Sequence, residues 1–260
     1  MYFLDADLEP LDKFGDFDVS EPAFSPDGAM VVFSRGEGVV SDTTGSEFMS
    51  VFVVDTDGTG ERRLSREMYD LSPAWSPNGQ RVAFIRRSQG TRGVVVVDLA
   101  SGAAETVAAG VEWRQVIWRS DDEVVVTDWG SGGGMDPDLV AVTVSTGETR
   151  KVGTAPSAGT VWNAERTKVA SRRYGDPADV VVLDVVTGEI AAVPGSASRS
   201  AEPFVWTPDG DLLFSQNVRG PNVNVAHSPG GTGAPTVVSR GFPETGSRPI
   251  AANPACGGLD

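Results

Sequence analysis

The chain has 260 residues and a formal net charge of −15, from 21 Lys and Arg against 36 Asp and Glu. A protein this acidic is repelled by nucleic acid and by anionic membrane surfaces, so we expect neither as a partner. The single cysteine, Cys256, excludes an intrachain disulfide and a zinc site built from cysteines. No apolar run in the sequence approaches the roughly 18 residues of a membrane-spanning helix, and we expect no membrane insertion.

The first ten residues, MYFLDADLEP, are acidic where a secretion signal has a basic stretch followed by an apolar run. This start predicts a cytoplasmic protein if Met1 is the natural first residue. A chain whose leader had been removed would begin in the same way, so the sequence leaves the compartment open.

A short apolar strand, a tight turn and a second apolar strand recur along the chain. The clearest copy is PAWSPNGQRVAF, from Pro73 to Phe84. One aromatic residue marks each copy, at a spacing of about 43 to 51 residues, which is typical of the blades of a β-propeller. These aromatic residues are Phe24, Trp75, Trp118, Trp162 and Trp206. Their repetition in every copy indicates packing between neighbouring blades.

A second hairpin follows each copy, made of Val-rich runs that are broken by Thr-Gly or Ser-Gly. Glycine accepts the positive φ that such turns need. The run VVVV at Val94 to Val97 is apolar on both sides, as expected for a strand that is covered on both faces. Each repeat therefore predicts four strands. A sandwich or barrel would not repeat the same four-strand unit five times.

The two ends of the chain extend this pattern. Tyr2 to Phe14 is similar to the second hairpin of a repeat, and Ser247 to Asn253 is similar to the opening of a first strand. We therefore predict an all-β, six-bladed β-propeller in a single domain, with a last blade of three or four strands assembled from both termini. The predicted blades are 20–65, 71–108, 114–153, 158–194, 201–239, and 247–260 together with 1–15. We expect a monomer.

The run from Val51 to Phe84, VFVVDTDGTGERRLSREMYDLSPAWSPNGQRVAF, resembles the TolB-like, WD40-like (PD40) propeller repeat. The third and fourth copies depart from that pattern at their turns, which read RSDD at 119–122 and NAER at 163–166. Proteins with this repeat include the periplasmic propeller of the Tol system, sugar-lyase propellers and the gating propellers of peptidases. The resemblance implies a propeller fold, and an extracytoplasmic location if a leader was removed.

Several residues suggest a metal or a catalytic group, but a structural interpretation is stronger. The segment Asp55 to Glu61 lacks the third ligand position and the distal Glu of a calcium loop, so it indicates a turn. We expect no metal and no cofactor. His227, the only histidine, cannot build a site with several imidazoles, and no Gly-x-Ser-x-Gly elbow accompanies it. We predict a turn role for His227. The same role is predicted for the aligned aspartates Asp5, Asp55, Asp98 and Asp184.

One repeated position, at the end of the second strand, carries arginine in three of five copies of an otherwise acidic protein. The aligned residues are Arg35, Arg86, Asp128, Arg172 and Gln216. These arginines are either solvated side chains paired with nearby acids or a basic ring at the channel mouth that holds a carboxylate or phosphate. Trp113 and Trp129 fall outside the repeated aromatic position and are candidates for apolar contacts with a ligand.

We expect a non-enzymatic scaffold that binds a protein or peptide, including an acidic segment, at the loop face and channel mouth. The candidate binding residues are Arg35, Arg86, Arg87, Trp113, Trp129, Arg172, Arg173, Tyr174, Gln216, Glu21 and Glu202. One alternative is an enzyme that acts on a small anionic or sugar substrate through channel carboxylates such as Glu21 and Glu202. Another is a structural or sensor module of a larger protein.

Overall fold

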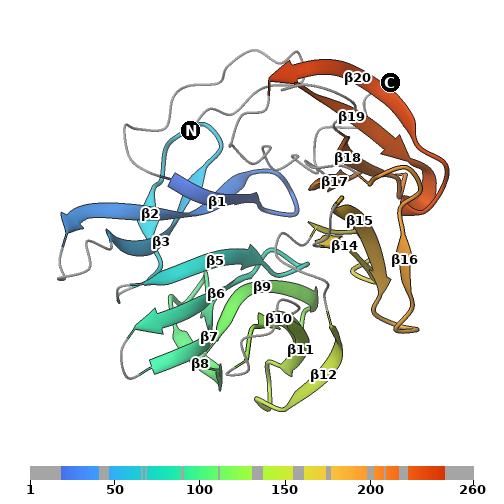
Figure 1. Ribbon diagram of the computed structural model, residues 1–260. Coiled ribbons are helices and arrows are strands. Elements are labelled where there is room, and N and C mark those ends of the chain that lie inside the picture. Colours follow the sequence, from blue (N-terminus) through green and yellow to red (C-terminus); the bar gives the residue numbers. More distant parts are fainter. Residues whose placement is uncertain are drawn as a thin grey trace. The chain divides into compact units, whose positions relative to one another are not determined.

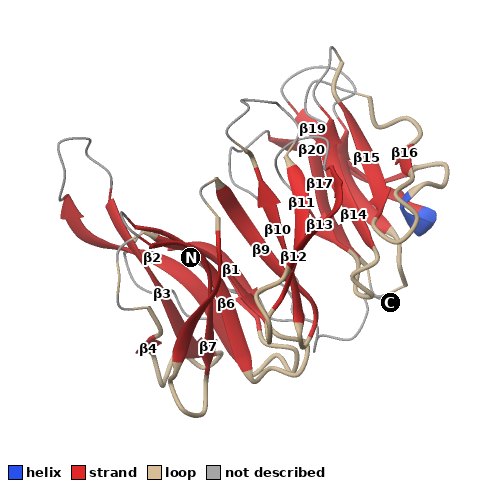
Figure 2. Cartoon of the chain, turned by 90° about the horizontal axis from the view of Figure 1, so that it is seen from below, coloured by secondary structure: helices blue, strands red, loops and turns tan. Residues whose placement is uncertain are grey.

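In the structure of the chain, a computed structural model, β-strands are the main secondary structure of the described residues. It describes residues 19–40, 47–65, 67, 69–88, 91–110, 112–130, 137–154, 161–173, 177–197, 202–207, 209–216 and 222–243. Figure 2 shows that strands make up most of this part of the chain, with one short helical turn, η1 (Pro229–Gly231). Within the described ranges, no helix has the length and apolar character to cross a membrane.

The strands form five four-stranded antiparallel sheets, and each sheet follows the order of the chain (Figure 1). The first contains β1 (Val19–Phe24), β2 (Met30–Val40), β3 (Glu47–Asp55) and β4 (Arg62–Arg63). The second contains β5 (Asp70–Trp75), β6 (Arg81–Ser88), β7 (Thr91–Asp98) and β8 (Ala104–Ala109). The third contains β9 (Trp113–Ser120), β10 (Glu123–Asp128), β11 (Asp138–Thr143) and β12 (Thr149–Thr154). The fourth contains β13 (Val161–Trp162), β14 (Lys168–Arg173), β15 (Asp179–Asp184) and β16 (Ile190–Ala192). The fifth contains β17 (Glu202–Trp206), β18 (Leu212–Gln216), β19 (Asn222–Ser228) and β20 (Thr236–Pro243).

The prediction of an all-β propeller is confirmed, but the prediction of six blades is wrong, because the described chain forms five blades. The segments 1–15 and 247–260, from which the sixth blade was predicted, lie outside the described residues. Neither segment contains the Ser-Pro-Asp-Gly turn or the Val-rich strand pair found in the clearest repeats. A likeness over a few residues at each end was therefore too little to predict a blade.

The described residues fall into two compact units. One contains the chain up to Asp128 together with Ala141–Arg150, and so holds the first two blades and most of the third. The other contains Trp129–Val140 and the chain from Lys151 to the end of β20, with the last two blades.

The Ser-Pro-Asp-Gly turn between the first and second strands is closed by its own side chains. In the first blade, the Ser25 hydroxyl donates to Asp27 Oδ1 (2.6 Å) and accepts from the Met30 N–H (2.9 Å). In the second blade, the Ser76 hydroxyl donates to Asn78 Oδ1 (2.8 Å) in the same way. Ser25 and Ser76 are buried. The turn recurs because these side chains satisfy backbone groups that would otherwise be buried without a partner.

The repeated tryptophan joins one blade to the one before it. In the second, third and fifth blades, the indole N–H donates to a backbone carbonyl in the first strand of the preceding blade. The pairs are Trp75 to Ala23 (3.0 Å), Trp118 to Ala74 (3.1 Å) and Trp206 to Val161 (3.0 Å). These three tryptophans are buried, and Trp118 is fully so. The packing role predicted for them is confirmed.

The aspartates of the second hairpin bind turn backbone, as predicted for Asp98 and Asp184. Asp98 Oδ1 accepts from the N–H (2.8 Å) and hydroxyl (2.7 Å) of Ser101. Asp184 Oδ1 accepts from the N–H groups of Val186 (2.8 Å) and Thr187 (3.0 Å). These hydrogen bonds hold the pKa of both carboxyls below its usual value. Asp5 lies outside the described residues.

This turn chemistry predicts a loss of stability in acid. A carboxyl with a lowered pKa binds protons more readily in the unfolded chain, so its contribution is complete above the ordinary pKa of about 3.9 and is lost as the pH falls through the folded value. We expect the free energy of unfolding, measured by urea titration between about pH 2 and 5, to decrease with falling pH. Asp184→Asn keeps an acceptor oxygen but does not titrate, and should make this dependence shallower. An unchanged pH dependence in Asp184→Asn would contradict the assignment.

Candidate functional site

Arg35, near the middle of the long strand β2, is held by a two-point ion pair. Its Nη1 lies 2.8 Å from Glu61 Oε2, and its Nη2 donates to Glu61 Oε1 at 3.0 Å. The guanidinium also lies over the ring of Phe52, with 3.9 Å between its carbon and the ring centroid. The Arg35 side chain is 18% exposed and that of Glu61 is 42% exposed. The carboxylate of this pair can therefore be reached from solvent.

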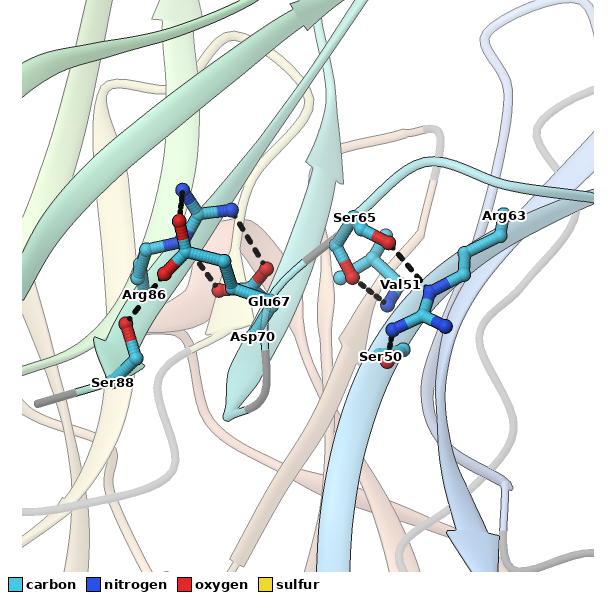
Figure 3. Close-up of polar contacts among 8 residues, drawn as sticks. All are labelled: Ser50, Val51, Arg63, Ser65, Glu67, Asp70, Arg86 and Ser88. Carbon is cyan, nitrogen blue, oxygen red and sulfur yellow. Dashed lines mark hydrogen bonds and ion pairs between the residues drawn. The ribbon is translucent and has the colours of Figure 1, made fainter. Parts of the chain in front are cut away.

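Arg86, in β6, is paired with a buried carboxylate (Figure 3). Its Nε and Nη2 each lie 2.9 Å from an oxygen of Asp70, whose side chain is 0% exposed. Glu67 Oε1 lies 3.5 Å from Nη1, and the Ser88 hydroxyl donates to Glu67 Oε2 at 3.0 Å. Burial raises the pKa of Asp70, opposed by the hydrogen bonds from Arg86, and the same bonds raise the pKa of Arg86.

Arg172, in β14, links the fourth blade to the fifth. Its Nη1 donates to Glu202 Oε1 at 2.8 Å, and Glu202 is the first residue of β17. The side chains of Arg172 and Glu202 are 26% and 45% exposed. The adjacent Arg173 forms a two-point pair with Asp179 inside its own blade, at 2.9 and 2.5 Å. A carboxylate therefore lies next to the guanidinium of each of these two arginines.

Glu21 occupies a strained position that recurs in the next blade. Glu21 in β1 and Ser72 in β5 both have a left-handed backbone, with φ of 54° and 53°, where the strand register shifts. The Ser72 N–H donates to Glu21 Oε2 (2.7 Å). The Ser72 hydroxyl lies 2.9 Å from Glu21 Oε1 and 2.8 Å from the Arg114 carbonyl, and its single proton serves one acceptor at a time. Glu21 thus binds the first strand of the neighbouring blade.

The remaining candidates differ in how much surface they offer. Trp113 is 5% exposed and packs on Gly110, where a Cβ would lie 2.1 Å from the indole, so it presents little surface to a partner. Trp129 and Arg87 are half-buried. Tyr174 lies outside the described residues, and of Gln216, at the end of β18, only the backbone is described.

His227 fastens a turn, as predicted. Its Nε2 lies 2.7 Å from Asp211 Oδ2, and Asp211 Oδ1 accepts from the Gly230 N–H at 2.7 Å. These contacts hold η1 between β19 and β20, and they lower the pKa of Asp211, the Gly230 bond most strongly. In the described ranges, no group of three or more His, Cys, Asp or Glu residues is placed to hold a metal ion.

Comparison with solved structures identifies the architecture. TolB from Acinetobacter baumannii superposes with a TM-score of 0.64 at 14% identity, over 90% of this chain and 60% of that chain. The chain has a TolB-like β-propeller fold. The same architecture occurs in an oligogalacturonate lyase in complex with manganese (TM-score 0.60, 16% identity, 86% of this chain and 72% of that one). A Mycobacterium tuberculosis puromycin-hydrolyzing peptidase also matches, with a TM-score of 0.61 at 18% identity, over 90% of this chain and 40% of that chain.

Sequence relatives agree with the TolB-like resemblance, which is confirmed. A protein TolB homolog from Chlorobium luteolum is 29% identical over 163 residues, which is 59% of this chain and 36% of that protein. The Tol-Pal system protein TolB from Haemophilus influenzae is 40% identical over 72 residues, which is 27% of this chain and 17% of that protein. The matches therefore span about a third or less of these relatives' own length. No family model matches the chain.

Sequence reasoning missed a buried serine that anchors the outer strand in two blades of the TolB-like propeller. The Val51 N–H donates to the Ser65 hydroxyl (2.8 Å), and Arg63 binds the Ser65 carbonyl (2.6 Å; Figure 3). In the fourth blade, the Val180 N–H donates to the Ser196 hydroxyl (2.9 Å). The only sequence signal for this contact was a serine a few residues after the fourth strand of the blade. Serine is too common in loops for that position to predict a buried hydrogen bond.

Proposed function

We propose that this TolB-like propeller is a non-enzymatic scaffold that binds a protein or peptide segment through the arginine–carboxylate pairs of the second strands. The observation that carries the proposal is the contrast between repeated positions. Turn serines, tryptophans and hairpin aspartates bind the propeller's own backbone. Arg35 and Arg172 instead bind half-exposed carboxylates, which leaves charged groups accessible at one aligned position.

The three pairs differ in what a partner can reach. Glu61 and Glu202 are 42% and 45% exposed, so an incoming carboxylate can exchange with them and take up a two-point contact with the arginine. Asp70 is fully buried, so Arg86 keeps its internal partner. Arg35 in the first unit and Arg172 in the second are therefore each, by themselves, a contact that favours an acidic side chain, and Arg86 supports the scaffold. The Haemophilus relative is named as a protein of the Tol-Pal system, which supports a protein partner.

A peptide-binding experiment tests this function. Peptides selected from a displayed library of extended sequences on the wild-type protein should contain Asp or Glu. We expect them to bind Arg35→Ala/Arg172→Ala at least about tenfold more weakly in fluorescence anisotropy, since lost charge-assisted hydrogen bonds account for that much. Arg150→Ala is the matched control, because Arg150 is 57% exposed and pairs with Glu123 away from this position. Equal affinity for the double variant and wild type would show that neither arginine binds the selected peptides.

A further inference from the structure

The hairpin of β6 and β7 places two arginines opposite each other. Arg87 in β6 is the direct partner of Arg92 in β7 in the antiparallel register. In the fourth blade the equivalent cross-strand partners are Arg173 and Asp179, which form a two-point ion pair. The positions are equivalent because Arg87 and Arg173 each follow the aligned arginine of their second strand. Like charges directly opposite in a sheet are destabilising, so the second blade carries a repulsive pair where the fourth carries an attractive one.

A third arginine joins this pair through Glu112, the residue before β9. Glu112 Oε1 lies 4.0 Å from Arg92 Nη1, and Glu112 Oε2 lies 4.0 Å from Arg114 Nη2. A charge-assisted hydrogen bond is about 2.7–2.9 Å long, so this carboxylate lies between two guanidinium groups at more than hydrogen-bond distance from each. We call Arg87, Arg92, Arg114 and Glu112 the basic patch. All four belong to the first compact unit.

The basic patch has an excess of positive charge on a protein whose net charge is −15. Asp128, at the end of β10, lies opposite Trp113 in the register with β9, and the arginines outnumber the acids even when Asp128 is included. The side chains of Arg92 and Arg114 are 40% and 50% exposed. Arg87 is half-buried. An anion from solvent can therefore reach the patch.

The backbone that carries the basic patch is held in place. The Arg87 N–H donates to the Tyr69 carbonyl (2.9 Å), and the Arg92 carbonyl accepts from the Gly110 N–H (3.1 Å). The buried Trp113, at the start of β9, packs on Gly110. The arginines thus project from strands that are already ordered, which reduces the entropy lost when a ligand binds.

We propose that the basic patch binds the phosphate monoester group of a ligand. A phosphate group carries nearly two negative charges at neutral pH and three acceptor oxygens, so it can accept hydrogen bonds from more than one guanidinium. The bound dianion offsets the repulsion between Arg87 and Arg92, which the single carboxylate of Glu112 shares with Arg114. The patch uses none of the residues of the Arg35 and Arg172 pairs, so it does not depend on the peptide-binding function proposed above.

Isothermal titration calorimetry in phosphate-free buffer tests the patch with two probes, glycerol 3-phosphate and a blocked Gly-phosphoserine-Gly peptide. We expect saturable binding to the wild type that weakens as sodium chloride is raised from about 50 to 500 mM, because salt screens exposed charges. The probe that binds more tightly identifies the source of the phosphate, and equal affinity assigns recognition to the phosphate group itself. A blocked Gly-Glu-Glu-Gly peptide also carries two negative charges, but spread over two groups, and should bind more weakly.

Arg92→Asp is the decisive variant, because it gives the second blade the Arg–Asp pair of the fourth. We expect it to weaken binding of the phosphate probes at least about tenfold, through loss of charge-assisted hydrogen bonds. Its Tm should equal or exceed that of wild type, since a repulsive cross-strand pair becomes attractive. Arg150→Asp is the matched control: it changes the net charge equally, and Arg150 is 57% exposed and pairs with Glu123 outside the patch. This control should bind the probes nearly as tightly as wild type.

Three results would overturn the proposal. The first is a wild-type protein that binds neither phosphate probe saturably. The second is equal weakening by Arg92→Asp and Arg150→Asp, which would show an effect of net charge rather than of a site. The third is an affinity for Gly-Glu-Glu-Gly equal to that for the phosphate probes, which would show that the patch does not select phosphate.

Discussion

Replacing Trp118 with alanine is expected to lower the free energy of unfolding by about 3–5 kcal/mol. Trp118 is the largest fully buried side chain among the described residues, and its indole N–H donates to the Ala74 carbonyl of the preceding blade. The Arg81 guanidinium lies 5.0 Å from its ring centroid and would also lose a contact. Truncation therefore opens a cavity between two blades. Urea unfolding followed by far-ultraviolet circular dichroism measures the loss without relying on tryptophan fluorescence.

Trp118→Phe is the matched control, because it keeps an aromatic ring and removes the indole N–H. We expect a smaller loss, about 1–3 kcal/mol, from a buried carbonyl left without its donor. Trp129→Ala, at a half-buried position outside the repeat, should cost less than Trp118→Ala. If Trp118→Ala and Trp118→Phe were equally stable, packing between the blades would not be the role of this residue.

The parts of the fold that the sequence predicts are those set by local chemistry. The turn from Ser25 to Gly28 closes through hydrogen bonds between residues no more than five apart. The four-residue motif alone is therefore enough to predict it. The aromatic residue of the first strand recurs about every 44 residues, which is the length of one blade. In three blades it is a tryptophan whose indole N–H bonds the preceding blade. The terminal segments carry neither signal, and the predicted sixth blade was therefore wrong.

The partners of the aligned arginines could not be predicted in the same way. Glu61 lies 26 residues after Arg35, Asp70 lies 16 residues before Arg86, and Glu202 lies 30 residues after Arg172. Each carboxylate comes from a different strand or loop, so no fixed spacing marks these pairs. Asp70 is the first residue of β5, and its burial depends on the tertiary fold there, which a sequence pattern does not specify. The position of each arginine was predictable, but its electrostatic state was not.

The Asp70–Arg86 pair gives the second large effect, because one of its members is completely buried. Arg86→Ala is expected to lower the free energy of unfolding by about 3–5 kcal/mol, since it leaves the Asp70 carboxylate without its counter-charge. Arg173→Ala is the matched control: its side chain is 48% exposed and its partner Asp179 is 19% exposed. Pairs that reach solvent contribute about 0–1 kcal/mol, so the control should lose little. Urea unfolding at neutral pH compares the two variants.

The pH dependence separates a lost counter-charge from lost packing of the arginine stem. Burial already raises the pKa of Asp70, so the folded protein holds this proton better than the unfolded chain does, and the associated stability is lost as the pH rises through the folded pKa. Arg86→Ala removes the hydrogen bonds that oppose this rise, so its deficit relative to wild type should shrink in acid, where Asp70 is neutral. Asp70→Asn/Arg86→Ala should regain part of the loss at neutral pH. A deficit that is the same at every pH, with no recovery in the double variant, would show that Arg86 stabilises the blade through packing alone.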